Sequence, residues 1–283
     1  MSEMAVSGLL AQIQHWLEED DLLRNFHYSR SLPETQVRAV LKIKSPLILA
    51  GTDYLKATFM ALGCSYTDFD FLNSLEGKTF VSGENIEFPK TLSFARAVTG
   101  ERLALNLVQH ASSIATYTKK FVALAQPHGI KILDTRKTTP GMRTLEKYAV
   151  RVGGGFNHRM AQTDAWMIKD NHKASLGGIK GAWDFFIAQG AFYNNIIVEI
   201  HNLNELNEAR ELGVKHVMLD NFQPDNIREA VKLKVPSMTF ELSGGITLET
   251  LEQYLIQGVD AISVGALTHS APRCDLSLKF GTT

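Results

Sequence analysis

Short apolar segments alternate with amphipathic stretches between residues 131 and 266, and this alternation constrains the fold more than any other feature. The segments are KILDT (131–135), AWMIKD (165–170), IIVEI (196–200), HVMLD (216–220), MTFELSG (238–244) and AISVGA (261–266). Helical windows lie between the later segments, at residues 204–212, 224–234 and 248–257. Such alternation is typical of parallel strands joined by right-handed crossovers. The pattern therefore predicts an α/β barrel or most of one, with fewer strands than a complete barrel has.

Roughly the first 100 residues have a different pattern of apolar and polar side chains, which predicts a separate small α/β domain. Residues 6–26 carry apolar side chains at helical spacing, and residues 37–51 and 79–88 show the alternation and turn residues of antiparallel strands. A long helix is expected over residues 94–126, with an interruption near Thr99 and Gly100. A chain of 283 residues has room for both domains.

Composition and charge exclude several classes of function. Hydrophobic residues make up 45% of the chain and charged residues 21%, as in globular proteins. The net charge of −1 gives no basic field, so general nucleic-acid binding is not expected, and any anion site must come from local clusters. No apolar run is long enough for a membrane span, and the N-terminus has no signal-peptide pattern. Cys64 and Cys274 lack metal-ligand spacing, so we expect a reducing compartment, the cytoplasm.

Polar side chains and glycines follow every predicted barrel strand. In barrels of this kind the active site lies at the carboxyl ends of the strands. In chain order these positions are Asp134, Thr135, Arg136 and Lys137; Lys169, Asp170, Asn171 and His172; Glu199 and His201; Asp220 and Asn221; Ser243, Gly244 and Gly245; and Gly265 and Ala266. Between the first two strands lie a glycine run, 153–155, and then Asn157, His158 and Arg159. The sequence therefore predicts one active site at this end of the barrel.

These residues belong to three chemical kinds. The cationic group comprises Arg136, Lys137, His158, Arg159 and Lys169. Such groups in one pocket would repel one another unless the ligand is polyanionic. The carboxylates of Glu199 and Asp220 suit Mg²⁺ or sugar hydroxyls. The glycines after the last two strands free backbone N–H groups to approach a phosphate.

Each feature has a structural alternative when it is taken alone. Asp134 could cap its strand, Lys137 or Lys169 could be a surface lysine, and the Gly-Gly pair could be only a turn. The constellation favours a functional site, because the charges follow successive strands rather than falling at random.

A long part of the chain resembles the signature of a known family. LDTRKTTPGMRTLEKYAVRVGGGFNHR, followed by MIKDNH, is similar to the signature of the quinolinate phosphoribosyltransferases. The likeness continues through ERLALNLVQHASSIAT (101–116), VEI (198–200), MLDN (218–221), ELSGGI (241–246) and SVGALTHSAPRCDLSLK (263–279), and it covers roughly residues 90–280. The resemblance implies an N-terminal α/β sandwich domain, residues 1–110 joined by 268–283, and an open α/β barrel, residues 111–267.

The resemblance also implies a reaction and the residues that serve it. Family members transfer phosphoribose from phosphoribosyl pyrophosphate to quinolinate in the presence of Mg²⁺, and they release pyrophosphate and CO₂ to give nicotinate mononucleotide for NAD biosynthesis. Carried onto this sequence, the pattern assigns catalytic roles to Lys137, Lys169, Glu199 and Asp220, the last two also as metal ligands. It assigns substrate contacts to these four and to Arg102, Thr135, Arg136, His158, Arg159, Ser243, Gly244, Gly245, Val264, Gly265 and Ala266. It further implies a homodimer, sometimes assembled further, in which Arg102 enters the partner's site.

Several positions depart from the family pattern. They are His201, where an acidic residue is usual; His110, the basic residue after Gln109; Ala161 and Gln162, in place of Gly-Leu; and FHYS (26–29), in place of a Gly-Asp-Ile-Thr-like stretch. These departures concern details at the margin of the site and leave its central cluster intact.

Two alternatives of other classes stay open on the sequence. One is a Schiff-base aldolase in which Lys169 attacks a phosphorylated sugar. The other is a relative of the family that only binds a metabolite or uses another acceptor. Borohydride trapping would identify the first, and ligand binding without pyrophosphate release would identify the second. In the family interpretation, Asp134 is a structural residue at a strand end rather than a catalyst.

Overall fold

The computed structural model describes residues 3–20, 31–190, 193 and 195–282, and it divides into two compact units. The first unit comprises Met1–Thr116 and Pro272–Thr283, and the second comprises Tyr117–Ala271. The C-terminal segment thus belongs to the first unit. The FHYS stretch at 26–29 lies outside the described residues.

The first unit is built on an antiparallel sheet, as the sequence predicted. The sheet has the order β12 (Leu276–Thr282), β1 (Gln36–Ile43) and β4 (Asn85–Glu87), and β5 (Leu92–Ser93) also pairs with β1. A separate ladder joins β2 (Leu47–Ile48) to β3 (Thr79–Phe80). Alternate residues of β1 are buried, because one face of the sheet covers the core of the unit.

Helices complete this core. They are α1 (Glu3–Leu17) with η1 (Glu18–Asp20), α3 (Thr52–Ala61), η2 (Tyr66–Ser74) and α4 (Phe94–Ala125). The core cluster includes Leu41, Phe59, Phe69, Val108 and Leu276, so strands and helices far apart in the sequence share it. The helix predicted over residues 6–26 is α-helical as far as Leu17 and 3₁₀-helical over Glu18–Asp20, and residues 21–26 lie outside the described part of the chain.

The expected interruption of the long helix at Thr99 and Gly100 is wrong, because α4 is continuous from Phe94 to Ala125. Gly100 serves close packing instead. A Cβ atom at this position would lie 2.9 Å from both Phe59 Cε1 and Leu62 Cδ1. The glycine therefore marks a tight contact and not a break in the helix.

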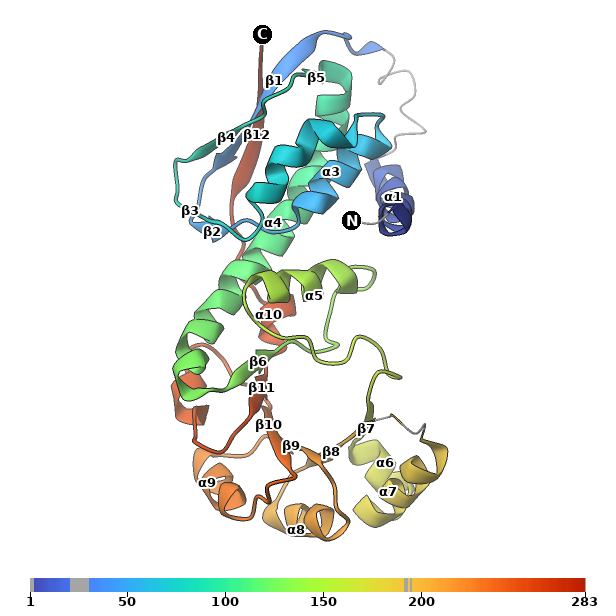
Figure 1. The fold of residues 1–283 in the computed structure, drawn as a ribbon, viewed down its shortest axis with the longest axis vertical. Helices are drawn as coiled ribbons and strands as arrows, with labels where there is room; N and C mark the ends of the chain where they lie inside the picture. The colour runs from blue at the N-terminus through green and yellow to red at the C-terminus, as the bar shows by residue number, and fades with distance from the viewer. Residues whose placement is uncertain (1–2, 21–30, 191–192, 194, 283) are drawn as a thin grey trace. The chain divides into compact units, whose positions relative to one another are not determined.

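The second unit contains a parallel sheet of six strands that does not close into a barrel (Figure 1). The strand order is β6 (Lys131–Leu133), β11 (Ala261–Ser263), β10 (Thr239–Ser243), β9 (His216–Asp220), β8 (Ile196–Ile200) and β7 (Trp166–Ile168), and every neighbouring pair is parallel. All six strands fall within the predicted segments. Among the described residues, the edge strands β6 and β7 do not pair with each other, so the expected open barrel is confirmed.

The helices of this unit include α7, α8 and α9, which lie along the outer side of the curved sheet (Figure 1). In chain order they are η3 (Gln126–His128), α5 (Arg143–Val152), α6 (Asp170–Ser175), α7 (Gly178–Gln189), α8 (Leu203–Glu211), α9 (Pro224–Lys232), η4 (Leu251–Tyr254) and α10 (Ala266–His269). In the described part of the chain, no helix is both long and apolar enough to cross a membrane.

The helix expected over residues 248–257 is wrong, since only the short 3₁₀ turn η4 forms there. The Thr250 hydroxyl accepts a hydrogen bond from the Thr247 backbone N–H at 3.0 Å. Local side-chain bonds of this kind compete with the helical pattern. Leu251 is the one residue of η4 that is buried, so little apolar surface favours a longer helix.

Replacing Gly100 by valine should destabilise the first unit by about 1–3 kcal/mol, because the added methyl groups have no space beside Phe59. Gly8→Val is the matched control, since Gly8 also lies inside a helix but a Cβ there would meet nothing within 4 Å. The control should change the free energy of unfolding by less than about 0.5 kcal/mol. Urea denaturation followed by circular dichroism measures both, and equal losses would contradict the packing explanation.

Candidate active site

A cavity of about 520 Å³ lies at the carboxyl ends of the parallel strands, and we call it the strand-end cavity. It is lined by Thr135, Arg136, Lys137, His158, Arg159, Met167, Lys169, Glu199, Met218, Asp220, Asn221, Ser243, Gly244, Gly245 and Ser263. Residues from all six strand ends or the loops beside them thus surround one space. The structure brings together the four residues predicted to be catalytic and most of those predicted to bind substrate.

Four predicted residues do not line this cavity. Val264 is buried, and Ala266 is the first residue of α10. Gly265 lies against a lining residue, because a Cβ on it would be 3.2 Å from Lys137 Cδ. Arg102 belongs to the first unit, where it is exposed on α4.

A buried ion pair lies directly behind the cationic residues. Asp134, at the end of β6, pairs with Lys147 of α5, and both side chains are fully buried. Asn157 Nδ2 donates to Asp134 Oδ2 at 2.6 Å, and the His158 backbone N–H donates to Asp134 Oδ1 at 2.8 Å. Lys147 Nζ also donates to the His158 carbonyl at 3.0 Å. Burial raises the pKa of the Asp134 carboxyl and lowers the pKa of the Lys147 ammonium, while their mutual attraction opposes both shifts.

His158 is held in one orientation by two contacts. Its Nδ1 accepts the Arg159 backbone N–H at 2.8 Å, so the proton of the neutral ring belongs on Nε2. Nε2 lies 3.2 Å from Glu241 Oε2 and can donate to it. The other oxygen, Glu241 Oε1, is buried and has no hydrogen-bond partner among the described residues. Glu241 therefore holds the imidazole through one oxygen and leaves the other without a hydrogen bond from the described residues.

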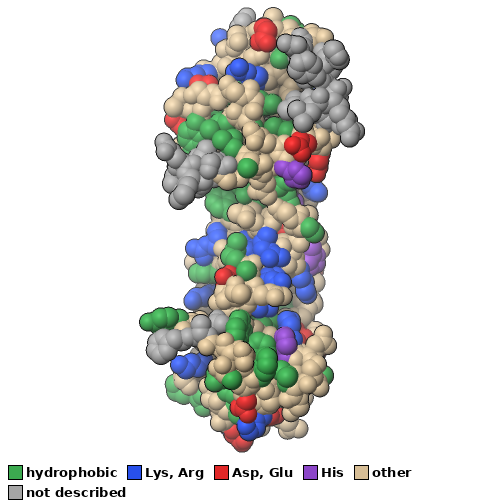
Figure 2. Space-filling model, turned by 90° about the vertical axis from the view of Figure 1, so that its right-hand side faces the viewer, with side chains coloured by type: hydrophobic (Ala, Val, Ile, Leu, Met, Phe, Trp, Pro, Cys, Tyr) green, Lys and Arg blue, Asp and Glu red, His purple; other side chains and the backbone are tan. Residues whose placement is uncertain are grey.

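The two guanidinium groups of the cavity, those of Arg136 and Arg159, lie close enough to interact electrostatically. Burial lowers the pKa of Arg159, and the nearby Arg136 lowers it further. Arg136 Nε is buried without a partner among the described residues. On the face drawn in Figure 2, Lys and Arg side chains gather near the middle of the view. A polyanion would relieve this repulsion, so the cluster suits a ligand with several negative charges.

Carboxylates occupy the neighbouring strand ends. Glu199, on β8, accepts a hydrogen bond from Lys169 Nζ at 2.7 Å through Oε2. Asp220, at the end of β9, accepts one from Asn221 Nδ2 at 2.7 Å. His201, just beyond β8, has its Nε2 3.8 Å from Glu199 Oε1 and 3.6 Å from Asp220 Oδ2. The carboxylate oxygens of Glu199 and Asp220 can bind a cation or accept hydrogen bonds from sugar hydroxyls.

The turn after β10 packs against the turn after β9. Asn221 has a φ of 56°, in the left-handed region, and its backbone N–H donates to the Ser243 carbonyl at 2.9 Å. Gly244 has a φ of 106°, and a Cβ on it would lie 2.2 Å from Asn221 Oδ1. Only glycine fits this position, and the next residue, Gly245, is exposed, so an anion can approach the backbone of the turn.

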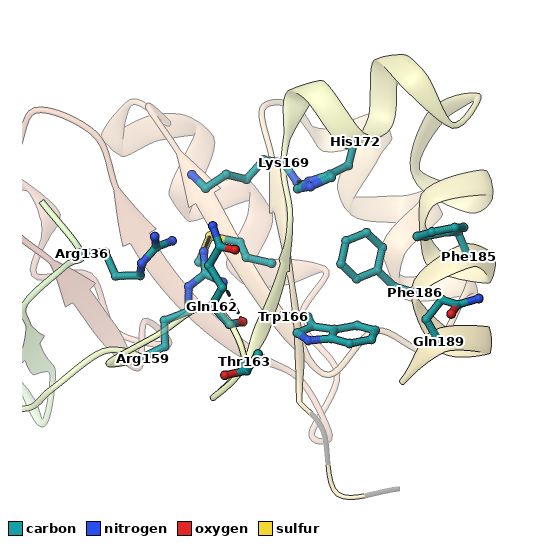
Figure 3. A pocket seen from close by; sticks show the side chains of 11 residues that line it. Arg136, Arg159, Gln162, Thr163, Trp166, Lys169, His172, Phe185, Phe186 and Gln189 are labelled. Atoms are coloured by element: carbon teal, nitrogen blue, oxygen red, sulfur yellow. Dashed lines mark hydrogen bonds between the residues drawn. The ribbon is translucent and has the colours of Figure 1, made fainter. Parts of the chain in front are cut away.

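A second cavity of about 410 Å³ adjoins the first, and we call it the aromatic side cavity. It shares Arg136, Arg159, Met167 and Lys169 with the strand-end cavity and adds Gln162, Thr163, Trp166, His172, Phe185, Phe186 and Gln189. In Figure 3, Arg136 and Lys169 reach toward the same space, and Trp166, Phe185 and Phe186 lie on the other side of the view. Cations and aromatic faces side by side suit a planar aromatic acid.

Sequence reasoning missed several residues that hold the site. They are Lys147 and Glu241, which orient other groups, and Met167, Met218 and Ser263, which line the cavity. Asn157 was named from the sequence, but its contact with Asp134 was not predicted. Glu241 had a usable signal, because it is a charged residue between the two buried apolar residues of its strand, Phe240 and Leu242. Lys147 had none, since a lysine in a charged helix is usually exposed.

Comparison with known proteins places these features in a family context. The family model of the C-terminal domain of quinolinate phosphoribosyl transferase matches residues 114–279. A protein of Bacillus subtilis strain 168, described as a probable nicotinate-nucleotide pyrophosphorylase (carboxylating), is 40% identical over 266 residues, covering 94% of this chain and 91% of the relative. The human nicotinate-nucleotide pyrophosphorylase (carboxylating) is 36% identical over 279 residues, covering 96% and 91%.

Solved structures show the same likeness. A crystal structure of NadC from Streptococcus pyogenes matches with a TM-score of 0.84 and 33% identity, covering 99% of this chain and 97% of that one. The nicotinate-nucleotide pyrophosphorylase of Francisella tularensis matches with a TM-score of 0.84 and 32% identity, covering 96% and 97%. The similarity therefore extends over both units and not only over the parallel sheet.

Replacing only one member of the Asp134–Lys147 pair should cost about 3–5 kcal/mol, because it leaves an uncompensated buried charge. Lys147→Met combined with Asp134→Asn should cost less than the sum of the single changes, since no charge is then left alone. Thermal and urea unfolding of the two single variants and the double variant measure the coupling. Additive losses would show that the pair does not act as a unit.

Proposed function

The chain belongs to the quinolinate phosphoribosyltransferase family, and we propose that its strand-end cavity holds both substrates of the family's reaction. That reaction transfers phosphoribose from phosphoribosyl pyrophosphate to quinolinate and releases pyrophosphate and CO₂, giving nicotinate mononucleotide for NAD biosynthesis. The observation that carries the proposal is the crowding of cations and carboxylates around one cavity. They are Arg136, Lys137, His158, Arg159 and Lys169, with Glu199 and Asp220.

Quinolinate would bind on the side of the cavity that adjoins the aromatic side cavity. Its two carboxylates suit the guanidinium forks of Arg136 and Arg159, which can each bond a carboxylate through two N–H groups. His158 and Lys169 complete the contacts. The nearness of Trp166 and Phe186, both lining the aromatic side cavity, supports a planar ring in this region.

Phosphoribosyl pyrophosphate would bind on the side of the glycine turn, with Lys137 beside its pyrophosphate. Gly244 and Gly245 have backbone that a phosphate can approach, because neither carries a side chain. The residues present also fit Mg²⁺, since Glu199 and Asp220 offer oxygen ligands that line the same cavity. Bound there with the donor, the ion would neutralise the charge of the leaving pyrophosphate.

Catalysis then depends on positioning and on charge rather than on a general base. The pyridine nitrogen of quinolinate carries a lone pair, so its attack on the ribose C1 needs no proton to be removed. Lys137 would stabilise the departing pyrophosphate, while Glu199 and Asp220 would stabilise the positive charge that grows on the ribose ring. Once the nitrogen is quaternary, loss of the adjacent carboxylate as CO₂ leaves an electron pair on the ring carbon beside a cation, which favours the loss. A proton from solvent then adds to that carbon to give nicotinate mononucleotide.

The Schiff-base alternative has no support in the site. A lysine that attacks a carbonyl must give up its proton, and low-polarity surroundings favour that. Lys169 Nζ instead lies 2.7 Å from Glu199 Oε2 in an ion pair, and its side chain is 48% exposed rather than enclosed by apolar groups.

Lys169→Ala and Arg136→Ala should each lower kcat/KM for quinolinate by about 100-fold or more, on the order of 3 kcal/mol of transition-state stabilisation. The matched control is Lys180→Ala, because Lys180 is an exposed lysine that pairs only with Asp184 on α7 among the charged side chains described. Formation of nicotinate mononucleotide and of CO₂ from the two substrates with Mg²⁺ measures turnover. Near wild-type turnover in both site variants would refute the assignment.

We further propose that the protein is a cytoplasmic homodimer in which Arg102 completes the partner's site; its free cysteines, Cys64 and Cys274, suit a reducing compartment. Arg102→Ala and Lys169→Ala should each inactivate the protein alone. Mixed under conditions of subunit exchange, the two variants should recover part of the wild-type activity, because one site in each mixed dimer is intact. Proven exchange without recovery would count against shared sites.

A further inference from the structure

The backbone of Lys137 is held by a threonine hydroxyl on each side. Its N–H donates to Thr135 Oγ1 at 3.0 Å, and its carbonyl accepts a hydrogen bond from Thr268 Oγ1 at 2.8 Å. Thr268 belongs to α10, 131 residues further along the chain, and it is only 3% exposed. No other described residue donates to this carbonyl. The Thr268 hydroxyl therefore links α10 to the loop that carries Lys137.

The single proton of the Thr268 hydroxyl belongs on this bond. The Gly265 carbonyl is also within reach of the hydroxyl, at 3.1 Å, but it already accepts the backbone N–H groups of Thr268 and His269 at 3.1 Å and 3.4 Å. A hydroxyl donates one hydrogen bond, and a partly buried carbonyl without a donor is costly. The Lys137 carbonyl has no second donor among the described residues, so it is the acceptor that needs the proton.

The side chain of Lys137 depends on its backbone for its position. It lines the strand-end cavity, but in the described part of the chain its ammonium has neither a hydrogen bond nor an ion pair. Its stem passes close to Gly265, where a Cβ atom would lie 3.2 Å from Lys137 Cδ. The direction of the side chain is therefore set by the backbone and by this contact with the residue that precedes α10.

We propose that Thr268 is a positioning residue, whose hydroxyl fixes the backbone of Lys137 so that the ammonium reaches the departing pyrophosphate. The inference rests on the proposed function, which places Lys137 beside that group. A misplacement of about 1 Å in an active site can cost on the order of 100-fold in rate, so the bond to the Lys137 carbonyl should affect turnover although Thr268 contacts neither substrate.

Loss of the Thr268 hydroxyl should leave the rest of the loop in place. Arg143 Nε donates to Thr138 Oγ1 at 3.0 Å, and the two oxygens of Glu146 lie 3.3 Å and 3.2 Å from the Thr139 backbone nitrogen and accept its N–H. These bonds hold the two residues that follow Lys137 without help from α10. The expected effect is therefore local, with the ammonium misplaced while the fold and the quinolinate side of the cavity are kept.

Steady-state kinetics of Thr268→Val with quinolinate, phosphoribosyl pyrophosphate and Mg²⁺ test the proposal. The kcat should fall about tenfold or more, whereas the KM for quinolinate should change by less than about twofold. Thr268→Ala, which adds no atoms, should show the same loss, and Thr268→Ser, which keeps the hydroxyl, should retain most of the wild-type kcat. In the Lys137→Ala background, Thr268→Val should lower kcat no further, because the ammonium that it orients is gone.

Thr58→Val is the matched control. Thr58 is also a buried threonine, and its Oγ1 donates to the Tyr54 carbonyl at 2.8 Å, but it belongs to the first unit and does not line the cavity. Both Thr58→Val and Thr268→Val should lose a few degrees of melting temperature, because each removes a buried hydrogen bond, but the control should keep the wild-type kcat.

Three results would overturn the proposal: a wild-type kcat in Thr268→Val, no rescue by Thr268→Ser, or an equal further loss of kcat in the Lys137→Ala background. Absence of turnover in the wild-type protein would instead refute the proposed function itself, so the two failures are distinguishable.

Discussion

The buried contact between Asp134 and Lys147 fixes the geometry on which the cationic half of the site depends. Asp134 accepts bonds from Lys147, Asn157 and the His158 backbone, so one carboxylate joins β6, α5 and the loop that follows the glycine run. Buried ion pairs contribute little net stability, but they hold their partners in one geometry. Arg136 lies two residues after Asp134, and Arg159 lies directly after His158. The buried contact therefore fixes the backbone from which both guanidinium groups of the cavity extend.

The barrel was predictable from sequence because short, mainly apolar segments recur between amphipathic ones, as parallel strands and their crossover helices do. Most polar residues that line the cavity come directly after these strands in the sequence, so the end of a strand also indicates where the functional side chains lie. Lys147, Asn157 and Glu241 were not predictable in their roles, because each acts on a residue distant in sequence, and only the fold brings them together. The break expected at Gly100 was wrong for a related reason, because Gly100 packs against Phe59, which belongs to another helix and is distant in sequence.

Repulsion between the cationic side chains of the free site favours the binding of anions. Arg136 lies close enough to Arg159 to help lower the pKa of its guanidinium, and Glu241 Oε1 is buried without a hydrogen-bond partner among the described residues. A dianionic acid would be attracted to the guanidinium groups and repelled by Glu241, so it should settle on the side of the arginines. Binding of such an acid would relieve an unfavourable arrangement in the free protein, and a ligand with two carboxylates would neutralise more of these cations than a ligand with one.

Lys169 connects the two halves, because it follows β7 at one edge of the sheet and pairs with Glu199 on the neighbouring strand. In the proposed reaction this lysine would contact an acceptor carboxylate, and it would then share its ammonium between that carboxylate and Glu199. A weaker Lys169–Glu199 pair would leave more of the negative charge of Glu199 available to a cation or to the positive ribose ring. Binding of quinolinate would thus change the charge around the phosphoribosyl pyrophosphate through Lys169 alone, without movement of the backbone.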